Sequence, residues 1–147
     1  MIKFYDKIED MPREELEQRL RESLEKPLPP IKPMPFRGKD TTVKYRYPEL
    51  VALCPMTGLP DLYDVFITLI PNGHVPELKS LRKYFVAYKD LPISHEHLCY
   101  RIQRDLNETL KPRYVKVILK VAVRGGIHTL VITEPRRRNN NDTVRRV

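Results

Sequence analysis

Tryptophan is missing from the 147-residue sequence and cysteine is rare, with two residues that stand in unlike contexts, Cys54 and Cys99. Such a pair does not make a disulfide framework and favours a reducing compartment, so we expect a cytoplasmic protein. No apolar run approaches the ~20 residues that cross a bilayer, and the stretch MIKFYDKIEDMPREELE lacks the hydrophobic segment of a secretory signal. No Cys-x-x-Cys motif occurs, and the pair His95 and His97 lacks the ligand spacing of zinc motifs. We therefore expect no membrane span and no metal site.

Acidic residues are outnumbered by basic ones, which gives a formal net charge of +8. The final stretch EPRRRNNNDTVRRV holds five arginines and two acids and supplies +3 of this charge. It is polar and without periodicity, so residues 135–147 are expected to form a basic disordered tail. Such a tail either solubilises the chain or contacts a nucleic acid or phosphate. The remaining +5 suits a polyphosphate cofactor or RNA and does not distinguish them.

Proline divides the chain into an arm and a folded unit. Residues 12–26 predict an amphipathic helix with a narrow apolar stripe made of Leu16, Leu20 and Leu24. Such a stripe suits docking on a neighbouring surface or subunit. Residues 27–36 read PLPPIKPMPF, which forbids helix and favours an extended connector. We therefore treat residues 1–38 as an N-terminal helix and proline-rich arm, and residues 39–134 as the folded unit.

The folded unit begins with two strands and a helix. Residues 41–50 are rich in β-formers, and residues 61–71 alternate so that three apolar side chains share one face: Val65, Ile67 and Leu69. Pro71-Asn72-Gly73 ends the second strand. Residues 77–89 then predict a helix with an apolar stripe made of Leu78, Leu81, Phe85 and Tyr88.

A second helix and a hairpin complete the unit. Ser94 is placed to cap a helix over residues 95–110, whose buried stripe consists of Leu98, Ile102, Leu106 and Leu110. After a predicted turn at Gly125-Gly126, residues 127–134 are expected to return as the hairpin partner of a strand at 114–124. Alternate apolar side chains of the strand at 114–124 share one face: Val115, Val117, Leu119, Val121 and Val123. The order β-β-α-α-β-β predicts an α+β fold, with an antiparallel four-stranded sheet and two helices on one face. Its two open edges favour oligomerisation.

The stretch 53-LCPMTGLPD-61 contains the most distinctive candidate for chemistry. Cys54 stands where a strand gives way to a turn that Pro55, Gly58 and Pro60 enforce, and loops on rigid strands often carry reactive groups. Asp61 follows the turn, and a carboxylate near a thiol can manage its proton. The alternative is a buried cysteine that acts as a small hydrophobe. Cys99 lies beside a helical apolar stripe and is expected to pack in the core.

Other polar residues at helix and strand ends have both ordinary and functional interpretations. Glu77 and Glu96 open helices, where the helix dipole favours a carboxylate. Arg124 stands beside glycines that let a ligand approach the backbone closely. Three cations lie off the apolar stripe of the first helix and suit either solvent or phosphate: Lys79, Arg82 and Lys83. None of these signals is specific by itself.

Taken in order, the motifs LCPMTGLPD, ELKSLRKY, His95-Glu96 and Arg124-Gly125-Gly126 resemble those of the 7-cyano-7-deazaguanine (preQ0) reductases. These are the nitrile reductases of the queuosine pathway, here in their single-module form, and the likeness covers residues 41–128. It implies a tunnelling fold that assembles into ring-shaped homo-oligomers of the kind built from two stacked pentamers. It also implies a cytoplasmic enzyme that reduces the free base 7-cyano-7-deazaguanine with NADPH.

The resemblance implies a role for each matching residue. Cys54 would attack the nitrile carbon to give a covalent thioimide, and Asp61 would supply the proton. The substrate would be bound by Pro76, Glu77, Leu78, His95 and Glu96. A carboxylate suits the N–H groups of a guanine-like edge. The cofactor would be bound by Leu78, Lys79, Arg82, Arg124 and Gly125. Cations suit the 2′-phosphate of NADPH.

Two alternatives remain open at this stage. Arg82 stands where the family has lysine, and Leu59 where glutamine is common, so the cofactor side departs more than the nucleophile side. A related archaeal branch keeps the cysteine and aspartate, lacks NADPH binding, and adds ammonia to the nitrile of the base within tRNA to make archaeosine. The second alternative is a module of the same fold that binds nucleotides or RNA without chemistry.

Overall fold

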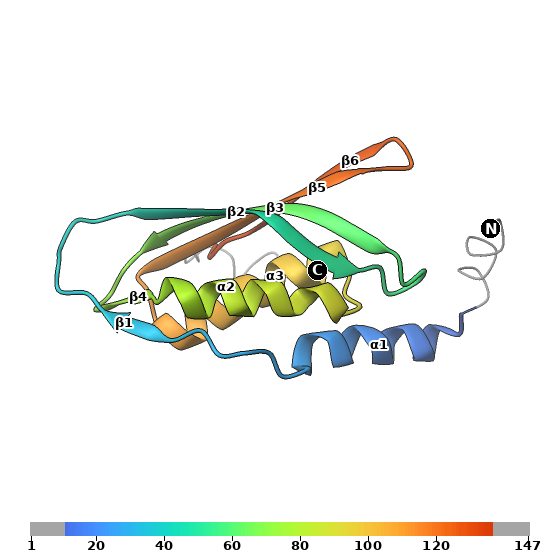
Figure 1. The fold of residues 1–147 in the computed structure, drawn as a ribbon, viewed down its shortest axis with the longest axis horizontal. Helices are drawn as coiled ribbons and strands as arrows, with labels where there is room; N and C mark the ends of the chain where they lie inside the picture. The colour runs from blue at the N-terminus through green and yellow to red at the C-terminus, as the bar shows by residue number, and fades with distance from the viewer. Residues whose placement is uncertain (1–10, 137–147) are drawn as a thin grey trace, which may run out of the picture.

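An antiparallel four-stranded sheet forms the frame of the computed structural model, which describes residues 11–136 (Figure 1). The strands lie in the order β2-β3-β5-β6, and every neighbouring pair is antiparallel. Their bounds are Val43–Leu53 for β2, Pro60–Ile70 for β3, Tyr114–Arg124 for β5 and Ile127–Thr133 for β6. The strands β2 and β6 are the edges of this sheet.

Two helices cover one face of the sheet (Figure 1). Helix α2 spans Leu78–Val86 and continues into the 3₁₀ turn η1 at Ala87–Asp90, and helix α3 spans His95–Leu110. The Ser94 hydroxyl accepts the His97 N–H at 3.2 Å, which confirms the predicted cap of α3. The α+β class, the antiparallel sheet and the two helices on one face are therefore confirmed.

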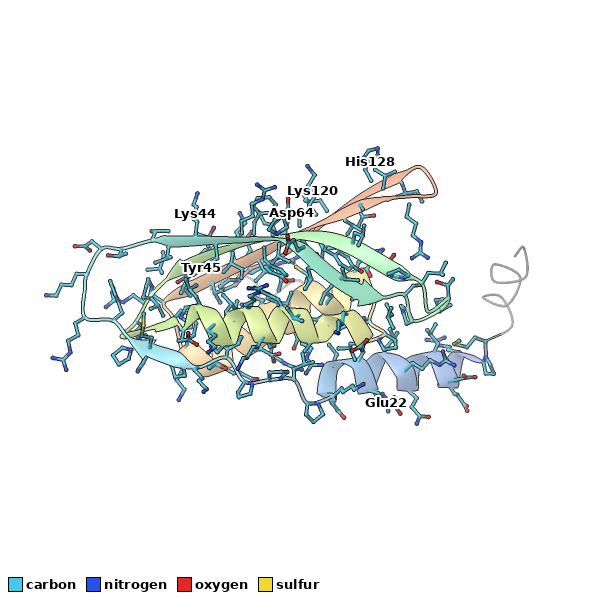
Figure 2. The ribbon with its side chains drawn as sticks, viewed as in Figure 1. Glu22, Lys44, Tyr45, Asp64, Lys120 and His128 are labelled. Carbon is cyan, nitrogen blue, oxygen red and sulfur yellow. The ribbon has the colours of Figure 1, made fainter. Side chains whose placement is uncertain are left out.

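The core lies between the sheet and these two helices. Alternate residues of β3 and β5 enter it, as the period of a strand requires, and the predicted stripe of α3 packs against them. Its most completely buried members are Val65, Leu69, Leu98, Ile102, Val115, Val117 and Leu119. The opposite face of the sheet is turned away from the helices, and Figure 2 shows Lys44, Asp64, Lys120 and His128 on it.

Two predicted core positions are exposed. Val123 is 53% exposed because the β5–β6 hairpin extends past the helices, as Figure 1 shows. Leu78 is 63% exposed because α2 begins there, at the open edge of β2, where no strand covers its side chain. Tyr84, which the predicted stripe omits, is buried in its place.

The proline-rich segment belongs to the folded structure and contains a strand that the sequence did not indicate. Strand β1 (Pro33–Pro35) pairs antiparallel with β4 (His74–Pro76), and Ile31 is buried in the core. The Lys32 N–H donates to the Ser80 hydroxyl at 2.9 Å. Proline has no N–H to donate to a strand ladder, so a proline-rich sequence argues against a strand. Sequence patterns therefore do not predict a strand pair in which Pro33 faces Pro76.

Helix α1 (Arg13–Glu25) is fastened to α3 by two arginines. Arg101 donates to the carbonyl of Ser23 at 2.6 Å and to that of Lys26, and Arg104 donates to the carbonyl of Leu24 at 2.7 Å. These carbonyls belong to the end of α1, which has no basic residue in its own last turn. The two arginines therefore supply the missing C-terminal cap, and α1 docks on its own chain.

We expect Arg101→Ala to lower the free energy of unfolding by about 2–4 kcal/mol, because Arg101 is 4% exposed and its loss leaves the carbonyls of Ser23 and Lys26 without their partner. Urea unfolding followed by circular dichroism measures this loss. Arg21→Ala is the matched control, since Arg21 is exposed and its closest contact with Glu17 is 4.0 Å, and it should change stability by less than about 0.5 kcal/mol. Equal losses in the two variants would contradict the fastening role.

Within residues 11–136, no helix is long and apolar enough to cross a membrane. The same residues hold no group of three or more His, Cys, Asp or Glu side chains that suits a metal ion. Residues 137–147 of the predicted basic tail lie outside the described part of the chain.

Candidate active site

The turn after β2 holds Cys54 in a closed loop. The Cys54 N–H donates to the Leu59 carbonyl at 2.8 Å, and the Cys54 carbonyl accepts the Gly58 N–H at 2.8 Å. Gly58 has φ of +69°, a conformation that favours glycine. The Leu59 N–H is bound by the Thr57 hydroxyl at 3.2 Å. The loop is thus determined by its own backbone, and it keeps the thiol at the end of the sheet, half-buried.

Contacts from two other segments fix this loop in place. The Leu53 N–H donates to the Leu91 carbonyl at 3.0 Å, and the Leu53 carbonyl accepts the Ile93 N–H at 2.9 Å. From α1, the Arg19 guanidinium donates to the Pro55 carbonyl at 3.2 Å. The nucleophile candidate is therefore carried on a support that includes the segment just before α3 and the N-terminal helix.

Asp61 and Arg124 form a partly buried ion pair beside the loop. Asp61 is 6% exposed, and Arg124 Nη1 donates to its Oδ1 at 2.5 Å. The second guanidinium nitrogen donates to the Thr57 hydroxyl at 3.2 Å. Arg124 reaches this position from the end of β5, where the register with β6 shifts between Val121 and Arg124. The bulge brings a predicted cofactor residue to the predicted proton donor.

The thiol of Cys54 has a lowered pKa. Burial alone raises it, but hydrogen bonds from the Thr57 hydroxyl and from the backbone of Thr57 and Met56, with the charge of Arg124, outweigh that effect. Burial raises the pKa of Cys99, which is fully enclosed and donates to the Val117 carbonyl at 3.4 Å. Cys99 is thus confirmed as a core residue, whereas Cys54 has the properties of a reactive thiol.

We expect Thr57→Ala to move the pH profile of Cys54 alkylation to higher pH. Loss of the hydroxyl removes a donor that stabilises the thiolate, so the pKa of Cys54 rises and less thiolate is present at a given pH. The rate of iodoacetamide labelling, read by peptide mass spectrometry between pH 5 and about 10, measures the shift. Thr57→Ser keeps the hydroxyl and should keep the wild-type profile. Identical profiles for the alanine and serine variants would rule out this role.

Tyr63 connects the thiol side of the site to the start of α3, and nothing in the sequence reasoning singled it out. Its hydroxyl lies 2.6 Å from His95 Nδ1, and the two rings meet edge to face with centroids 5.4 Å apart. Burial raises the pKa of Tyr63 well above its usual value, and the negative charges of Asp61, Cys54 and Glu96 raise it further. The charges of three predicted site residues therefore act on one buried phenol.

The alternation of inward and outward residues along β3 is the feature of the sequence that points to Tyr63. Asp61 and Tyr63 are two positions apart on β3 and share its inward face. The structure thus brings one group of predicted site residues together around Tyr63: Cys54, Asp61, His95, Glu96 and Arg124 with its neighbour Gly125.

The other predicted site residues lie at the opposite end of the sheet. Pro76 is buried in β4, and the Glu77 carboxylate caps α2 by accepting the N–H groups of Lys79 at 2.9 Å and Ser80 at 2.7 Å. These two backbone hydrogen bonds lower the pKa of Glu77. Glu77 therefore acts as the N-terminal cap of α2. Leu78 and Lys79, the first two residues of this helix, are exposed to solvent.

A groove runs beside this second group, between α2 and the open edge of β2. Its volume is about 330 Å³ and its cations come from both elements. Tyr47 stacks on Phe85 beneath it, with ring centroids 4.9 Å apart. The groove is lined by Lys44, Tyr45, Arg46, Tyr47, Ile67, Leu78, Leu81, Arg82 and Phe85.

The length of β3 separates the two groups. The strand begins beside the Cys54 loop at Pro60 and ends beside β4 at Ile70, which is about 30 Å at ~3.3 Å per residue. Figure 1 shows the β2–β3 turn and the β1–β4 pair at opposite ends of the molecule. A bicyclic base is far shorter than this, so one chain does not surround a single substrate with both groups.

Comparison with known proteins identifies the family of this chain. The family model described as QueF-like protein matches residues 60–140, which is more than half of the chain. The chain belongs to the QueF-like family. The NADPH-dependent 7-cyano-7-deazaguanine reductase of Thioalkalivibrio sulfidiphilus is 37% identical over 102 residues, which cover 69% of this chain and 79% of the relative. That of Halorhodospira halophila is 41% identical over 100 residues, which cover 68% of this chain and 85% of the relative.

A solved structure has a similar fold. The apo form of the archaeosine synthase QueF-Like superimposes with a TM-score of 0.57 and 26% sequence identity. The alignment covers 64% of this chain and 90% of that one. The proteins that this chain resembles are thus named for two different reactions.

Proposed function

We propose that the protein is an NADPH-dependent nitrile reductase that converts 7-cyano-7-deazaguanine to 7-aminomethyl-7-deazaguanine through a thioimide on Cys54. The observation that carries this proposal is a thiol of lowered pKa on a clamped turn, next to the buried Asp61–Arg124 pair. Relatives at 37% and 41% identity carry the name of this activity. A cytoplasmic location is part of this proposal, because two free cysteines suit a reducing compartment.

The chain's own residues supply the proton transfers of the first step. Asp61, held in place by Arg124, accepts the thiol proton of Cys54. The thiolate then forms the C–S bond to the nitrile carbon, and one C–N π bond breaks toward nitrogen. Asp61 returns the proton to that nitrogen, so the sum of the step is addition of S–H across the C–N triple bond.

Two hydrides complete the reduction from nitrile to amine, and NADPH supplies them when it is bound. The groove beside α2 suits this cofactor, because Arg82 offers a cation for a phosphate and Tyr45 offers an aromatic surface. Arg124 and Gly125 lie at the other end of the sheet, so in this proposal they join the cofactor site from a neighbouring subunit, with Gly125 at φ of +56° in an open turn.

A homo-oligomer assembles the two groups of site residues into one site. We propose that Glu77 and Leu78 of one subunit meet Cys54, His95 and Glu96 of the next, in the ring of subunits that the tunnelling fold forms. Exposed apolar side chains on the outer sheet face and at its edges support such contacts: Leu62, Phe66, Ile127, Leu130 and Ile132. The open edges of β2 and β6 support them as well.

The second candidate is the addition of ammonia to the same nitrile within tRNA, through the same thioimide. The likeness to the archaeosine synthase favours it, as does the basic outer face of the sheet, where Figure 2 shows Lys44, Lys120 and His128. The cation-lined groove beside α2 favours the reductase, because the tRNA reaction needs no dinucleotide.

One sample distinguishes these functions. The purified protein is mixed with free 7-cyano-7-deazaguanine and NADPH, and absorbance and intact mass are recorded together. The reductase oxidises about two NADPH per nitrile, the stoichiometry of successive hydride transfers. A mass adduct on Cys54 without NADPH oxidation supports the tRNA reaction, and the absence of both signals rejects each of these enzymes.

A further inference from the structure

Tyr63 lies at the centre of the candidate site without belonging to the nucleophile, the acid or the substrate-binding residues. It is 3% exposed, and its hydroxyl is directed at the ring of His95 across 2.6 Å. Its strand neighbour on the same face is Asp61. A buried phenol needs a hydrogen-bond partner, and the partner of Tyr63 is a residue of the candidate site.

The direction of this hydrogen bond follows from what surrounds the phenol. Burial together with the charges of Asp61, Cys54 and Glu96 keeps Tyr63 protonated, so its O–H has to find an acceptor. Within residues 11–136, the hydrogen bond recorded for this hydroxyl is the one to His95 Nδ1. The phenol therefore donates, Nδ1 accepts, and the ring proton of the neutral imidazole resides on Nε2.

We propose that Tyr63 is a positioning residue that fixes His95 in the Nε2–H tautomer and directs this N–H at an acceptor atom of the substrate heterocycle. The inference rests on the proposed function for the identity of the ligand. His95 is half-buried at the first position of α3, and Ser94 fixes the backbone there. The edge-to-face contact with Tyr63 limits rotation of the ring. Because the His95 ring is held through Nδ1, its Nε2–H is left as a hydrogen-bond donor with a fixed orientation.

The first test is the tautomer itself, read from ¹⁵N shifts of the histidine side chains in the wild-type protein. His95→Gln identifies the His95 signals among those of the four histidines. We expect an unprotonated Nδ1 and a protonated Nε2, and in Tyr63→Phe a mixture of the two tautomers. A protonated Nδ1 in the neutral ring of the wild-type protein overturns the proposal without recourse to any variant.

The second test separates binding from chemistry with Tyr63→Phe, which keeps the ring and removes the hydroxyl. With 7-cyano-7-deazaguanine as the probe, we expect KM to rise about tenfold, the size of one ordinary hydrogen bond, and kcat to stay within about twofold. Tyr84→Phe is the matched control, because it also removes a buried hydroxyl, one that donates to Asp105 at 2.7 Å. It should lower thermal stability and leave KM unchanged.

Each outcome of these tests has a definite meaning. An unchanged KM and an unchanged His95 spectrum in Tyr63→Phe overturn the positioning role. Equal rises of KM in Tyr63→Phe and Tyr84→Phe also overturn it, because they reveal a general loss of structure. A wild-type protein that neither turns over nor captures the nitrile overturns the proposed function and the orientation of His95 toward this base, while the ¹⁵N spectra still decide the tautomer.

Discussion

Cys54→Ala is expected to abolish both the covalent adduct and turnover, a loss that exceeds every other single change in this chain. The proposed chemistry forms its only bond between protein and substrate at the Cys54 sulfur, and no other side chain on the clamped turn is a nucleophile of comparable strength. Substrate should still bind, because the pocket residues remain. Intact-mass spectrometry with 7-cyano-7-deazaguanine and a continuous NADPH assay measure the two losses.

The second cysteine provides the control for this experiment. Cys99 is fully buried beneath β5 and donates to the Val117 carbonyl, so Cys99→Ala leaves a small cavity far from solvent. It should lower stability by roughly 1–2 kcal/mol and keep the adduct and most of the turnover. Full activity in Cys54→Ala, or an adduct that vanishes only in Cys99→Ala, would show that the proposed nucleophile is wrong.

Asp61→Asn is expected to slow thioimide formation by about 10²–10⁴ while substrate affinity changes little, because general acid–base catalysis contributes a factor of this order. Asparagine preserves the shape of the side chain and an oxygen for Arg124 Nη1, but it does not carry the thiol proton to the nitrile nitrogen. The rate of adduct formation on Cys54 at saturating substrate, sampled by quenching and mass spectrometry, measures this step alone.

Asp64→Asn makes the same substitution three residues along the strand. Asp64 lies on the opposite face of the sheet, paired with Arg46 at 2.8 Å, and Figure 2 shows it turned away from the helices. The rate of adduct formation should match the wild type in this variant. Equal slowing in the two variants would assign the effect to the sheet's electrostatics instead of to a proton carried by Asp61.

The frame of this fold was predictable from the sequence because its strands and helices bury one face each. The alternation of apolar residues in the strands predicted that Val65 and Val117 point into the core, and the helical period of 3.6 residues predicted the same for Ile102. The hydroxyl of Ser94 predicted the start of α3 at His95. Where an element extends past its cover, periodicity misleads. Leu78 and Val123 have the correct spacing for the core, yet α2 begins beyond the sheet edge and the hairpin extends past the helices.

The parts of the candidate site that lie at a turn or at a helix start were predictable from local sequence motifs. Contacts between residues that are far apart in the sequence were less so. The prolines and the glycine around Cys54 predicted the turn that holds it, but no local pattern connects Arg124 to Asp61, sixty-three positions apart. Tyr63 looks like any inward residue of a strand until its hydroxyl is seen at His95. The division of the site residues between two ends of β3 follows from strand length and pairing, which motifs do not encode.

The arginine fastening of α1 has a consequence for the order in which the chain acquires its structure during synthesis. The carbonyls of Ser23 and Lys26 leave the ribosome first, yet their partner Arg101 lies 78 and 75 positions later. Helix α1 therefore has to wait, uncapped at its C-terminal end, until α3 has been made and packed on the sheet. The contact of Arg19 with the Pro55 carbonyl, which supports the Cys54 loop, therefore reaches its final form only after α3 has been made and has capped α1.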